Sequence, residues 1–570
     1  MDFKKYIIFV IVLSFNCTID FAQTPSWVWA KTSYVLGGFS ESESVAIDNN
    51  GNIIVAGRFS SSSITFGNIV LSNNSISGKC DFFLVKYSPI GNVVWAKSYG
   101  GLDDESFPEV STDANGNIIL SGGFESNLIN FGSFVLSKSI ANSYSDFFIV
   151  KLGTNGNVLW AKSSGGAGTD WGIPSVDALG NIYIAGTYGS SSIMFDNINL
   201  VNSSGFSSQD FFLVKYSPSG NVIWAKSVGG NGGPIGGQES AKGISIDGNG
   251  NVIIICETTS TNISFDNVSI TTNGLYDFCV VKYDPNGNVI WAKSAGGSSY
   301  DFGRGVSIDA NANIYIVGTF SSSSIAFGSN TLLLSNASSS QQNSDIFIVK
   351  YDSNGNVIWA KSAESGYPEA VEGISTDLSG NVFLSGTFYS SCNFGNTQLL
   401  NNGPSGTRAM FIVKLDNNGN VIWAKSECIS QSSYGAYPIK NMLDANDNLI
   451  IAGSFDLPNL ILNGTTLTNY SYESHFVAKL NSATGLFGEI KRNGINIYPN
   501  PFYTKTQINF EKNVQNLQIE IYDIWGKSVY TQNFTGRVCS IEKGNLSPGV
   551  YFVQLNEKDL KYPIFKIIIE

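Results

Sequence analysis

Histidine is almost absent from this chain, since its 570 residues include only one, His475. Zinc or non-haem iron sites that need several histidines are therefore excluded by number. A Ser-His-Asp or Cys-His catalytic arrangement would have to depend on His475. This residue takes the place of Phe82 in a repeated strand phrase, so we interpret it as a tolerated strand residue. The sequence predicts no catalytic residue.

Charge is also scarce. Charged residues make up 14% of the chain, the net charge is -12 and the pI is about 4.7. An acidic surface repels phosphate backbones, which argues against a nucleic-acid partner. Hydrophobic residues, at 42%, supply enough apolar material for a core and argue against wholesale disorder. Beyond the N-terminus no segment approaches the ~18 apolar residues of a membrane-spanning helix.

The N-terminus has the pattern of a signal peptide. Lys4 and Lys5 precede an apolar run from Tyr6 to Phe15, and Ala22 and Gln23 offer a cleavage point. We predict removal of residues 1–22 and export through the periplasm to the outer surface or the medium.

Six cysteines remain after this cleavage, and they form no CxxC motif. Metal-knuckle and redox motifs are therefore absent, and we predict neither a metal ligand set nor a bound cofactor. The simplest interpretation is six small buried residues. Cys256 and Cys279 are the best-placed pair for a disulfide, because one repeat contains both.

One phrase, close to GNVIWAKS, recurs along the chain, and its tryptophans are 64 to 68 residues apart. The seven marker tryptophans are Trp29, Trp95, Trp160, Trp224, Trp291, Trp359 and Trp423. A phrase of the form SIDxxGNIYIAG and a strand phrase close to DFFLVKY keep the same period. Each unit thus offers four strands rich in Val, Ile, Phe and Tyr, with a D-x-x-G-N hairpin turn between two of them.

These phrases resemble the bacterial seven-bladed propeller repeats called SBBP repeats. The resemblance implies an all-β fold, with a seven-bladed β-propeller over residues 23–488. The chain starts with a lone WVWAKT strand, and its last unit lacks a WAKS phrase. We expect the first strand to complete the last blade and so remove the open sheet edges. The segment Gly485–Lys491 is an alternative for that place, and an open β-solenoid remains conceivable.

A second domain follows a linker at residues 489–494. Residues 495–570 contain short strand-like phrases that predict a small Ig-like β-sandwich. Their order resembles the type A sorting domain of the Bacteroidota type IX secretion system. The matching residues are Tyr498, Pro499, Asn500, Pro501, Gly526, Lys527, Pro548, Gly549 and Tyr551. This resemblance implies recognition by the outer-membrane translocon; the alternative is an ordinary C-terminal binding module.

Carboxylates recur in the loop before each D-x-x-G-N hairpin. In a propeller this loop opens on one face, so these acids are candidates for a partial ring that binds a cation or a basic ligand, or supplies a glycosidase pair. The alternative is that each acid bonds the amides of its own loop. The five acids are Glu105, Asp170, Glu239, Asp301 and Glu369.

Aromatic residues in the variable loops are further candidates for that ligand face, because they differ between units and exposed Tyr and Trp anchor glycan or protein contacts. They are Trp171, Tyr300, Tyr367, Tyr434 and Tyr437. The alternative is that they cover the ends of the units.

The remaining repeated residues have structural interpretations. The stretch Asp113–Asn117 resembles a calcium loop but lacks the bidentate glutamate, so we read it as turn chemistry, with a structural cation such as calcium left open. The repeated lysines, such as Lys86 and Lys97, are expected to pack their stems and keep their heads in solvent.

The sequence therefore predicts an exported, non-catalytic binding or adhesion module for a glycan or protein. Alternatives are a polysaccharide-active enzyme that uses carboxylates on the loop face, and a purely structural surface component. The identity of the ligand and the oligomeric state are not encoded in any motif.

Overall fold

The computed structural model is all-β, and its contacts divide the chain into two compact units, Pro25–Ser482 and a unit that contains Ala483–Glu570. The predicted signal peptide lies outside the described residues. The structure describes residues 25–76, 78–141, 143–203, 208–231, 237–335, 343–365, 369–403, 407–427, 436–456, 458–462, 464–481, 490–492, 495–498, 505–523, 526–544, 546–547, 549–557, 560–561 and 565–569.

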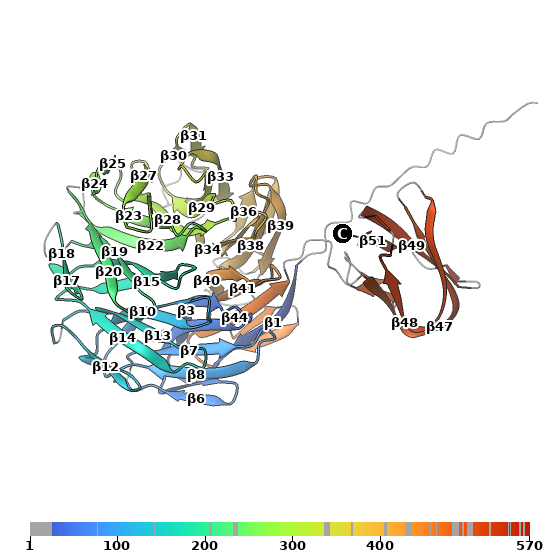
Figure 1. Cartoon of the computed structure of the whole chain (residues 1–570), viewed down its shortest axis with the longest axis horizontal. Coiled ribbons are helices and arrows are strands. Elements are labelled where there is room, and N and C mark those ends of the chain that lie inside the picture. The colour runs from blue at the N-terminus through green and yellow to red at the C-terminus, as the bar shows by residue number, and fades with distance from the viewer. Residues whose placement is uncertain are drawn as a thin grey trace, which may run out of the picture. The chain divides into compact units, whose positions relative to one another are not determined.

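In the first unit, the described residues form seven antiparallel sheets with four main strands each, arranged around a common centre (Figure 1). Sheet one consists of β3 (Ser40–Ile47), β4 (Ile53–Phe59), β7 (Asp81–Tyr87) and β8 (Val93–Tyr99), in spatial order from the inside outward. Its first strand contacts β9 of the next sheet and β40 of the last one, so the innermost strands form a closed ring.

Sheets two to six follow in chain order and have the same strand order. Sheet two contains β9 (Glu105–Thr112), β10 (Ile118–Phe124), β13 (Asp146–Leu152) and β14 (Val158–Ser164), and sheet three contains β15 (Asp170–Val176), β16 (Ile182–Tyr188), β19 (Asp210–Tyr216) and β20 (Val222–Val228). Sheet four contains β22 (Glu239–Ile246), β23 (Val252–Thr258), β26 (Asp277–Tyr283) and β27 (Val289–Ala295), and sheet five contains β28 (Asp301–Ile308), β29 (Ile314–Phe320), β32 (Asp345–Tyr351) and β33 (Val357–Ser365). Sheet six contains β34 (Ala370–Thr376), β35 (Val382–Phe388), β38 (Ala409–Leu415) and β39 (Val421–Glu427).

Sheet seven joins the two ends of this unit. It contains β40 (Ala436–Leu443), β41 (Leu449–Phe455) and β44 (Ser474–Asn481), and its outer strand is β1 (Ser26–Thr32). The pairing of β1 with β44 is antiparallel, and Trp27 Nε1 also donates to Glu427 Oε1 of sheet six at 2.6 Å. The first strand therefore completes the last sheet as expected. Residues 485–489 of the alternative segment Gly485–Lys491 lie outside the described residues.

The second and third strands of every sheet are buried along their whole length, except for one residue in β4 and the last residue of β44. Their side chains pack against those of neighbouring sheets; Leu84 and Leu120 of sheets one and two, for example, share one core cluster. This packing explains why the apolar runs in the sequence are nearly continuous rather than alternating.

Each unit also has a short hairpin that the sequence patterns did not predict. It lies between the second and third strands, as in β5 (Ser63–Phe66) and β6 (Ile69–Ser72). Some hairpins pair with a strand that precedes their sheet in the chain. β36 (Ser391–Phe394) pairs with β33 of the preceding sheet, and β5 pairs with β2 (Tyr34–Val35), a short strand that follows β1. The hairpins therefore connect neighbouring sheets.

The D-x-x-G-N turns lie at the opposite end of the sheets from these hairpins. In the turn of sheet two, Asp113 Oδ1 accepts from the amides of Asn115 and Asn117 at 2.9 Å, and Gly116 has a φ of 75°. Asp113 Oδ2 accepts from Asn117 Nδ2 at 2.9 Å and pairs with Lys151 Nζ at 3.0 Å. The carboxylate is thus used by the turn itself, which supports the turn interpretation.

The repeated lysine of the third strand is buried, so the expectation of a solvated head was wrong for Lys86. Its Nζ pairs with Asp48 Oδ2 at 2.7 Å and donates to the Thr154 carbonyl of the next sheet at 3.1 Å. The marker Trp95 donates to the same carbonyl at 3.3 Å. This contact recurs around the ring, with Trp160, Trp224, Trp291 and Trp359 donating to the corresponding carbonyls.

The second unit consists of one antiparallel network. Its strands are β45 (Ile490–Arg492), β46 (Ile495–Tyr498), β47 (Lys505–Tyr522), β48 (Ser528–Glu542), β49 (Gly549–Glu557), β50 (Leu560–Lys561) and β51 (Phe565–Ile569). Alternate residues such as Ile519, Ile521 and Val553 form its core. Because β45 pairs with β46, the predicted linker 489–494 is partly a strand, and the unit begins before residue 495.

Candidate functional site

The five predicted ligand-face acids are buried. Each lies at the start of an inner strand, where its side chain is at most 6% exposed. They are Glu105, Asp170, Glu239, Asp301 and Glu369. The predicted ring of acids is therefore not presented to a ligand at the surface of this structure.

Asp170, Glu239 and Asp301 bond groups of their own loops instead. The Asp301 carboxylate accepts hydrogen bonds from Ser322 Oγ at 2.6 Å and from the Gly297 amide at 2.7 Å. Asp170 accepts from Ser190 Oγ at 2.9 Å in the same way. These bonds connect the loop between two sheets to the loop after the second strand, which supports the structural alternative for the repeated acids.

Burial also keeps some of these acids protonated near neutral pH. It raises the pKa of Glu105 to about 9 and that of Asp170 to about 7, because protein replaces the water that would solvate the charge. Their charge is therefore not a constant feature of the loop face.

The inner strands surround a central channel. A cavity of about 190 Å³ lies between them and is lined from all seven sheets, including Ser44, Glu109, Pro174, Lys242, Arg304, Glu372 and Lys440. The inner strand of each sheet is antiparallel to the second strand, so the start of the first lies beside the end of the second. Glu41 of β3, for example, lies opposite Arg58 of β4. We call this end of the channel the mouth.

An exposed aromatic pair lies at the mouth between sheets two and three. The rings of Phe107 and Trp171 are 5.2 Å apart, and Phe107 is 46% exposed. Phe107 has a φ of 58°, in a left-handed region that bulky residues rarely occupy. Such backbone strain, of order 1–3 kcal/mol, persists where the surrounding structure imposes it and often accompanies function.

A second aromatic group lies between sheets four and five. Tyr300 stacks on Tyr276 at 5.9 Å and on Phe302 at 6.1 Å, and the Arg304 guanidinium lies 4.8 Å from the centre of the Phe302 ring. Tyr300 is 36% exposed, so part of this stack faces solvent.

Two further arginines stack on rings at the mouth. The Arg408 guanidinium lies 4.7 Å from the ring centre of Tyr389 and 5.8 Å from that of Tyr437, while Arg58 lies 5.6 Å from Phe39. We call the aromatic and arginine side chains of the mouth the collar: Phe39, Arg58, Phe107, Trp171, Tyr276, Tyr300, Phe302, Arg304, Tyr389, Arg408 and Tyr437.

Three of the predicted aromatic residues belong to the collar: Trp171, Tyr300 and Tyr437. Tyr367 and Tyr434 lie outside the described residues. The arginines were not predicted as site residues, although a signal was present. The chain contains only five arginines, and three of them, Arg58, Arg304 and Arg408, lie in the first unit.

Charged side chains enter the channel through β-bulges. The inner strands β3, β22, β28 and β34 each contain one extra residue opposite their partner strand. The extra residues are Glu43, Lys242, Arg304 and Glu372. A bulge redirects a side chain, and here it places charges where a regular strand would not.

Most of these charges are paired. Glu43 pairs with Arg58 at 2.9 Å, and Lys440 pairs with Glu109. Burial nevertheless raises the pKa of Glu43 to about 8, despite the neighbouring Arg58 guanidinium. Burial also raises the pKa of Glu372.

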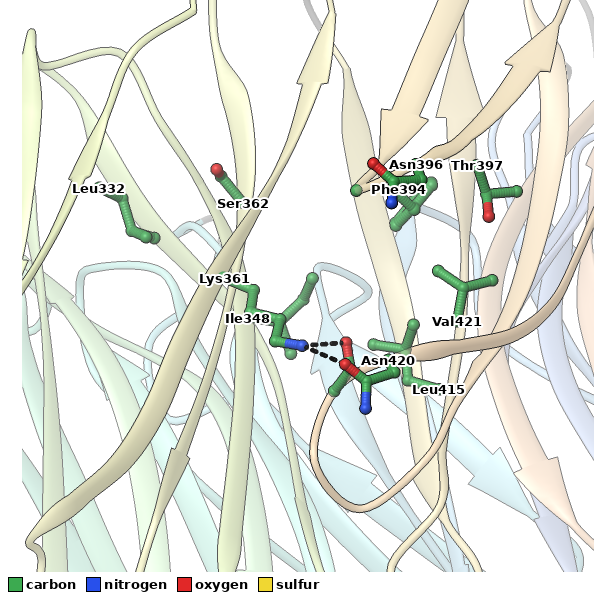
Figure 2. A pocket seen from close by; sticks show the side chains of 12 residues that line it. Leu332, Ile348, Lys361, Ser362, Phe394, Asn396, Thr397, Leu415, Asn420 and Val421 are labelled. Atoms are coloured by element: carbon green, nitrogen blue, oxygen red, sulfur yellow. Dashed lines mark hydrogen bonds between the residues drawn. The ribbon is translucent and has the colours of Figure 1, made fainter.

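A larger cleft lies on the outer edge of the ring, between sheets five and six (Figure 2). Its volume is about 550 Å³, and Ile348, Phe394 and Leu415 contribute to its lining. Lys361 Nζ donates there to the Gly419 carbonyl at 2.8 Å and to Asn420 Oδ1 at 3.1 Å. The cleft brings together no pair of titratable groups that would suggest chemistry.

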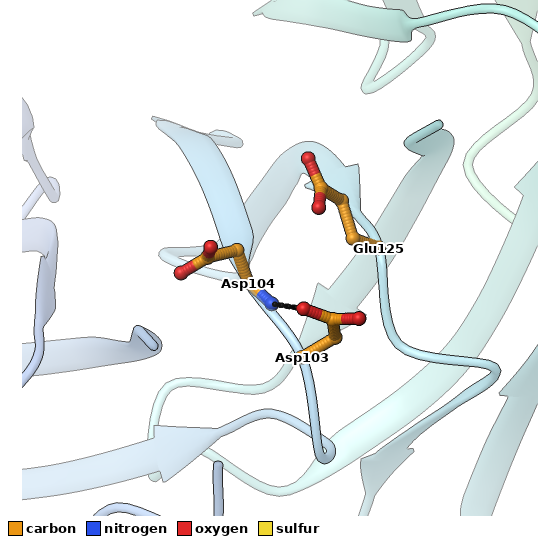
Figure 3. A group of neighbouring side chains, drawn as sticks. All are labelled: Asp103, Asp104 and Glu125. Atoms are coloured by element: carbon orange, nitrogen blue, oxygen red, sulfur yellow. Dashed lines mark hydrogen bonds between the residues drawn. The ribbon is translucent and has the colours of Figure 1, made fainter. Parts of the chain in front are cut away.

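Asp103, Asp104 and Glu125 form an acidic group on sheet two (Figure 3). Lys79 Nζ lies 3.0 Å from Asp103 and 2.8 Å from Asp104, so one ammonium group already pairs with two of the three carboxylates. The hydrogen bond to Lys79 also lowers the pKa of Asp103. This group offers no evidence for a metal site.

His475 is a core residue. It is fully buried beside Phe66 and Phe83, with ring centres at 5.2 and 5.3 Å, and its Nδ1 lies 3.1 Å from Ser42 Oγ. Burial lowers the pKa of its imidazole to about 3, so it stays neutral. This position supports the interpretation of His475 as a strand residue.

The expected cysteine pair forms a disulfide. Cys256 and Cys279 lie opposite each other on β23 and β26, inside sheet four. Of the cysteines described outside this pair, Cys80, Cys392 and Cys539 are buried thiols.

The described sorting-motif residues shape turns of the second unit. Gly526 has a φ of 79° in a turn where the Lys527 amide donates to Asp523 Oδ1 at 2.9 Å. Tyr551 is buried, and its hydroxyl donates to the Ser547 carbonyl at 2.8 Å. Tyr498 ends β46 and Gly549 begins β49. Pro499, Asn500, Pro501 and Pro548 lie outside the described residues.

None of the described residues forms a helix with the length and apolarity that a membrane span requires.

Sequence comparison finds one curated relative. It is an uncharacterized WD repeat-containing protein of Acanthamoeba polyphaga mimivirus, 26% identical over 491 residues, or 72% of this chain and 35% of the relative. The chain therefore spans about a third of the length of the curated relative that it matches.

Solved structures resemble the chain only distantly. A protein of unknown function from Dyadobacter fermentans is 11% identical, covers 79% of this chain and 99% of its own, and has a TM-score of 0.36. PorZ, a surface component of the type-IX secretion system of Porphyromonas gingivalis, is 12% identical, covers 93% of this chain and 81% of its own, and has a TM-score of 0.26.

The C-terminal match is to a family model. Residues 496–570 match the family described as "Secretion system C-terminal sorting domain". This domain marks proteins that the type IX system secretes to the cell surface or the extracellular space. The chain is therefore a secreted protein whose residues 496–570 are a type IX sorting domain.

Proposed function

We propose that the secreted chain is a non-catalytic binding module, a seven-bladed β-propeller of the SBBP repeat type that binds an extracellular glycan or protein ligand at its mouth. The seven sheets and the pairing of β1 with β44 support this architecture. For the second unit we propose an Ig-like β-sandwich that is recognised by the type IX translocon. The register breaks within β47 support it, because they let the two halves of this strand serve different layers.

The collar is the observation that carries the binding proposal. Exposed aromatic faces contribute much to recognition and lose little entropy on binding. Phe107, which is tilted against Trp171, and Tyr300, which stacks on Tyr276, offer such faces. They differ from sheet to sheet, whereas structural residues recur with the repeat. Strain at Phe107 is difficult to explain by packing alone, since its side chain is half exposed.

A Phe107→Ala substitution tests this proposal. In a glycan and peptide array probed with the secreted full chain, we expect a ligand whose affinity falls about tenfold, because one stacking face is lost. Leu179→Ala is the control: Leu179 is 82% exposed but lies in the turn at the opposite end of sheet three. Equal affinity of both variants and the unmodified chain would rule out the mouth as the site.

A polysaccharide-active enzyme is the second candidate, and Glu43 is the observation that favours it. A buried carboxyl with a pKa of about 8, close to Glu109, has the properties of a general acid. However, both carboxylates pair with cations, Arg58 and Lys440. Incubating each array ligand with the chain should release no new reducing ends; turnover that Glu43→Gln abolishes would establish the enzyme instead.

A chain with no ligand at all would be a structural component.

A further inference from the structure

The distribution of arginine singles out the collar. The chain has 33 Lys and Arg residues, of which five are arginines, so the repeat uses lysine almost everywhere. All three arginines of the first unit, Arg58, Arg304 and Arg408, lie on aromatic rings at the mouth. A planar guanidinium stacks on a ring and presents a rigid fork of N–H donors, which an ammonium group cannot do.

Two of these arginines are already paired with protein carboxylates. Arg58 lies 3.1 Å from Glu41 and 2.9 Å from Glu43. Arg304 lies 3.6 Å from Glu257, which Lys242 also approaches at 3.3 Å. These two guanidinium groups therefore mainly hold the collar and the channel together.

Arg408 differs from both. Tyr389 and Tyr437 hold its guanidinium by their rings, and no carboxylate of the described residues lies within salt-bridge distance of it. Stacking occupies the face of a guanidinium and leaves its edge for hydrogen bonds. An arginine fixed in this way is organised in advance to bind a carboxylate through two parallel hydrogen bonds.

The surroundings favour a sugar as the carrier of that carboxylate. Half-exposed rings such as Tyr300 and Phe107 offer flat faces around the mouth. The channel below them is small and lined by charged side chains, including Lys242, Glu372 and Lys440. The hydroxyl groups of a sugar can hydrogen-bond to these charged side chains. The apolar side chains of a peptide would instead bury the charges of the channel without hydrogen-bond partners.

We propose that the mouth recognises a carboxylate-bearing glycan, with Arg408 binding the carboxylate and the collar aromatics stacking on the sugar rings. This inference rests on the proposed binding function and specifies its ligand class. It also gives a role to one of the few arginines in a lysine-rich chain.

The experiment uses pairs of ligands that differ only in charge. The secreted full chain is titrated calorimetrically with uronate-containing oligosaccharides and with the methyl esters of the same oligosaccharides. We expect the acid form to bind at least tenfold more tightly than its ester. Arg408→Gln should remove this preference, Arg408→Lys should restore only part of it, and Arg537→Gln, a matched change in the second unit, should leave it intact.

Each alternative outcome has a distinct meaning. Equal binding of acid and ester, or a preference that survives Arg408→Gln, would overturn the carboxylate inference and leave the proposed binding function standing. Binding to peptides with a free C-terminal carboxylate but to no glycan would overturn the glycan as ligand. An absence of any ligand would overturn both proposals. The comparison of acid and ester on the unmodified chain needs no variant, so a folding defect of Arg408→Gln cannot obscure the result.

Discussion

At the scale of single residues, position in the repeat decides whether a charged group is structural. Glu105 and Asp301 recur with the repeat, are buried, and lie at the starts of inner strands. Glu43, Arg304 and Arg408 occupy places where other units have different residues. Arg304 lines the channel, Glu43 pairs with Arg58, and Arg408 lies over the ring of Tyr389. Repetition alone therefore predicts the structural role, while the exceptions to the repeat identify candidates for binding.

The buried acids predict how stability depends on pH. A pKa of about 9 for Glu105 in the folded state exceeds the ordinary value of 4.5, so the folded state binds the proton more tightly. Its stabilising contribution is complete below about pH 4.5 and is lost as the pH rises to about 9. Asp170, with a pKa of about 7, acts in the same direction over a narrower range.

Glu105→Gln tests this pH dependence. Glutamine stays neutral at every pH. The free energy of unfolding of the variant should therefore exceed that of the unmodified chain by about 1–3 kcal/mol at pH 9, and the two values should be similar at pH 5. Denaturant unfolding at both values measures the difference. If the two proteins respond to pH in parallel, Glu105 does not carry a raised pKa.

At the scale of elements, residues of the repeat phrases together form a contact between neighbouring sheets. Asp48 of a hairpin turn holds Lys86, and Lys86 and Trp95 both donate to the Thr154 carbonyl of the next sheet. The aspartate, lysine and tryptophan that define the repeat in the sequence therefore belong to one hydrogen-bonded group. Their distance in the chain hides this connection, because the acceptor belongs to the following unit.

Lys86→Met measures the strength of this contact. The substitution keeps the apolar stem but leaves the buried Asp48 carboxylate without its cation, which we expect to cost about 3–5 kcal/mol in the free energy of unfolding.

Lys97→Met is the control for this variant. Lys97 is half-buried in the same sheet and forms no ion pair with the described residues, so its replacement should change stability by less than about 0.5 kcal/mol. Similar losses for both variants would mean that the Asp48–Lys86 pair is not the stabilising feature.

At the scale of the whole molecule, the chain separates two tasks. Residues 496–570 form the sorting domain that leads to secretion, while the collar and the channel belong to the ring of sheets. The proposed binding surface draws side chains from all seven sheets, so it needs the complete ring, including the pairing of β1 with β44.

Passage across the outer membrane should depend on the C-terminal residues. In a host with a type IX system, a chain that lacks residues 496–570 should accumulate in the periplasm, and a reporter that carries an N-terminal signal peptide and residues 493–570 should appear outside the cell. Fractionation followed by immunoblotting measures both. Export of the truncated chain at the level of the complete one, or periplasmic retention of the reporter, would contradict the sorting assignment.

Much of this protein could be read from its sequence. Seven marker tryptophans predicted seven sheets, and the lone first strand predicted its pairing with the last sheet. The shared repeat of Cys256 and Cys279 made them the best-placed cysteine pair, although the simplest interpretation was six buried thiols. The hairpins such as β5–β6 were missed, because strands of four residues produce little periodic signal. The buried head of Lys86 was missed because its partner lies in a turn of the same sheet.

The sequence by itself determined the four main strands of each sheet, their turns, the number of sheets and the sorting domain, because each depends on residues that are close in the chain or recur with one period. Only the tertiary structure decided which charged and aromatic residues meet at the mouth. Phe107, Arg304 and Arg408 are hundreds of residues apart or belong to different sheets, and no local rule joins them. They come together because the ring closes and because bulges and a left-handed residue turn particular side chains toward its centre.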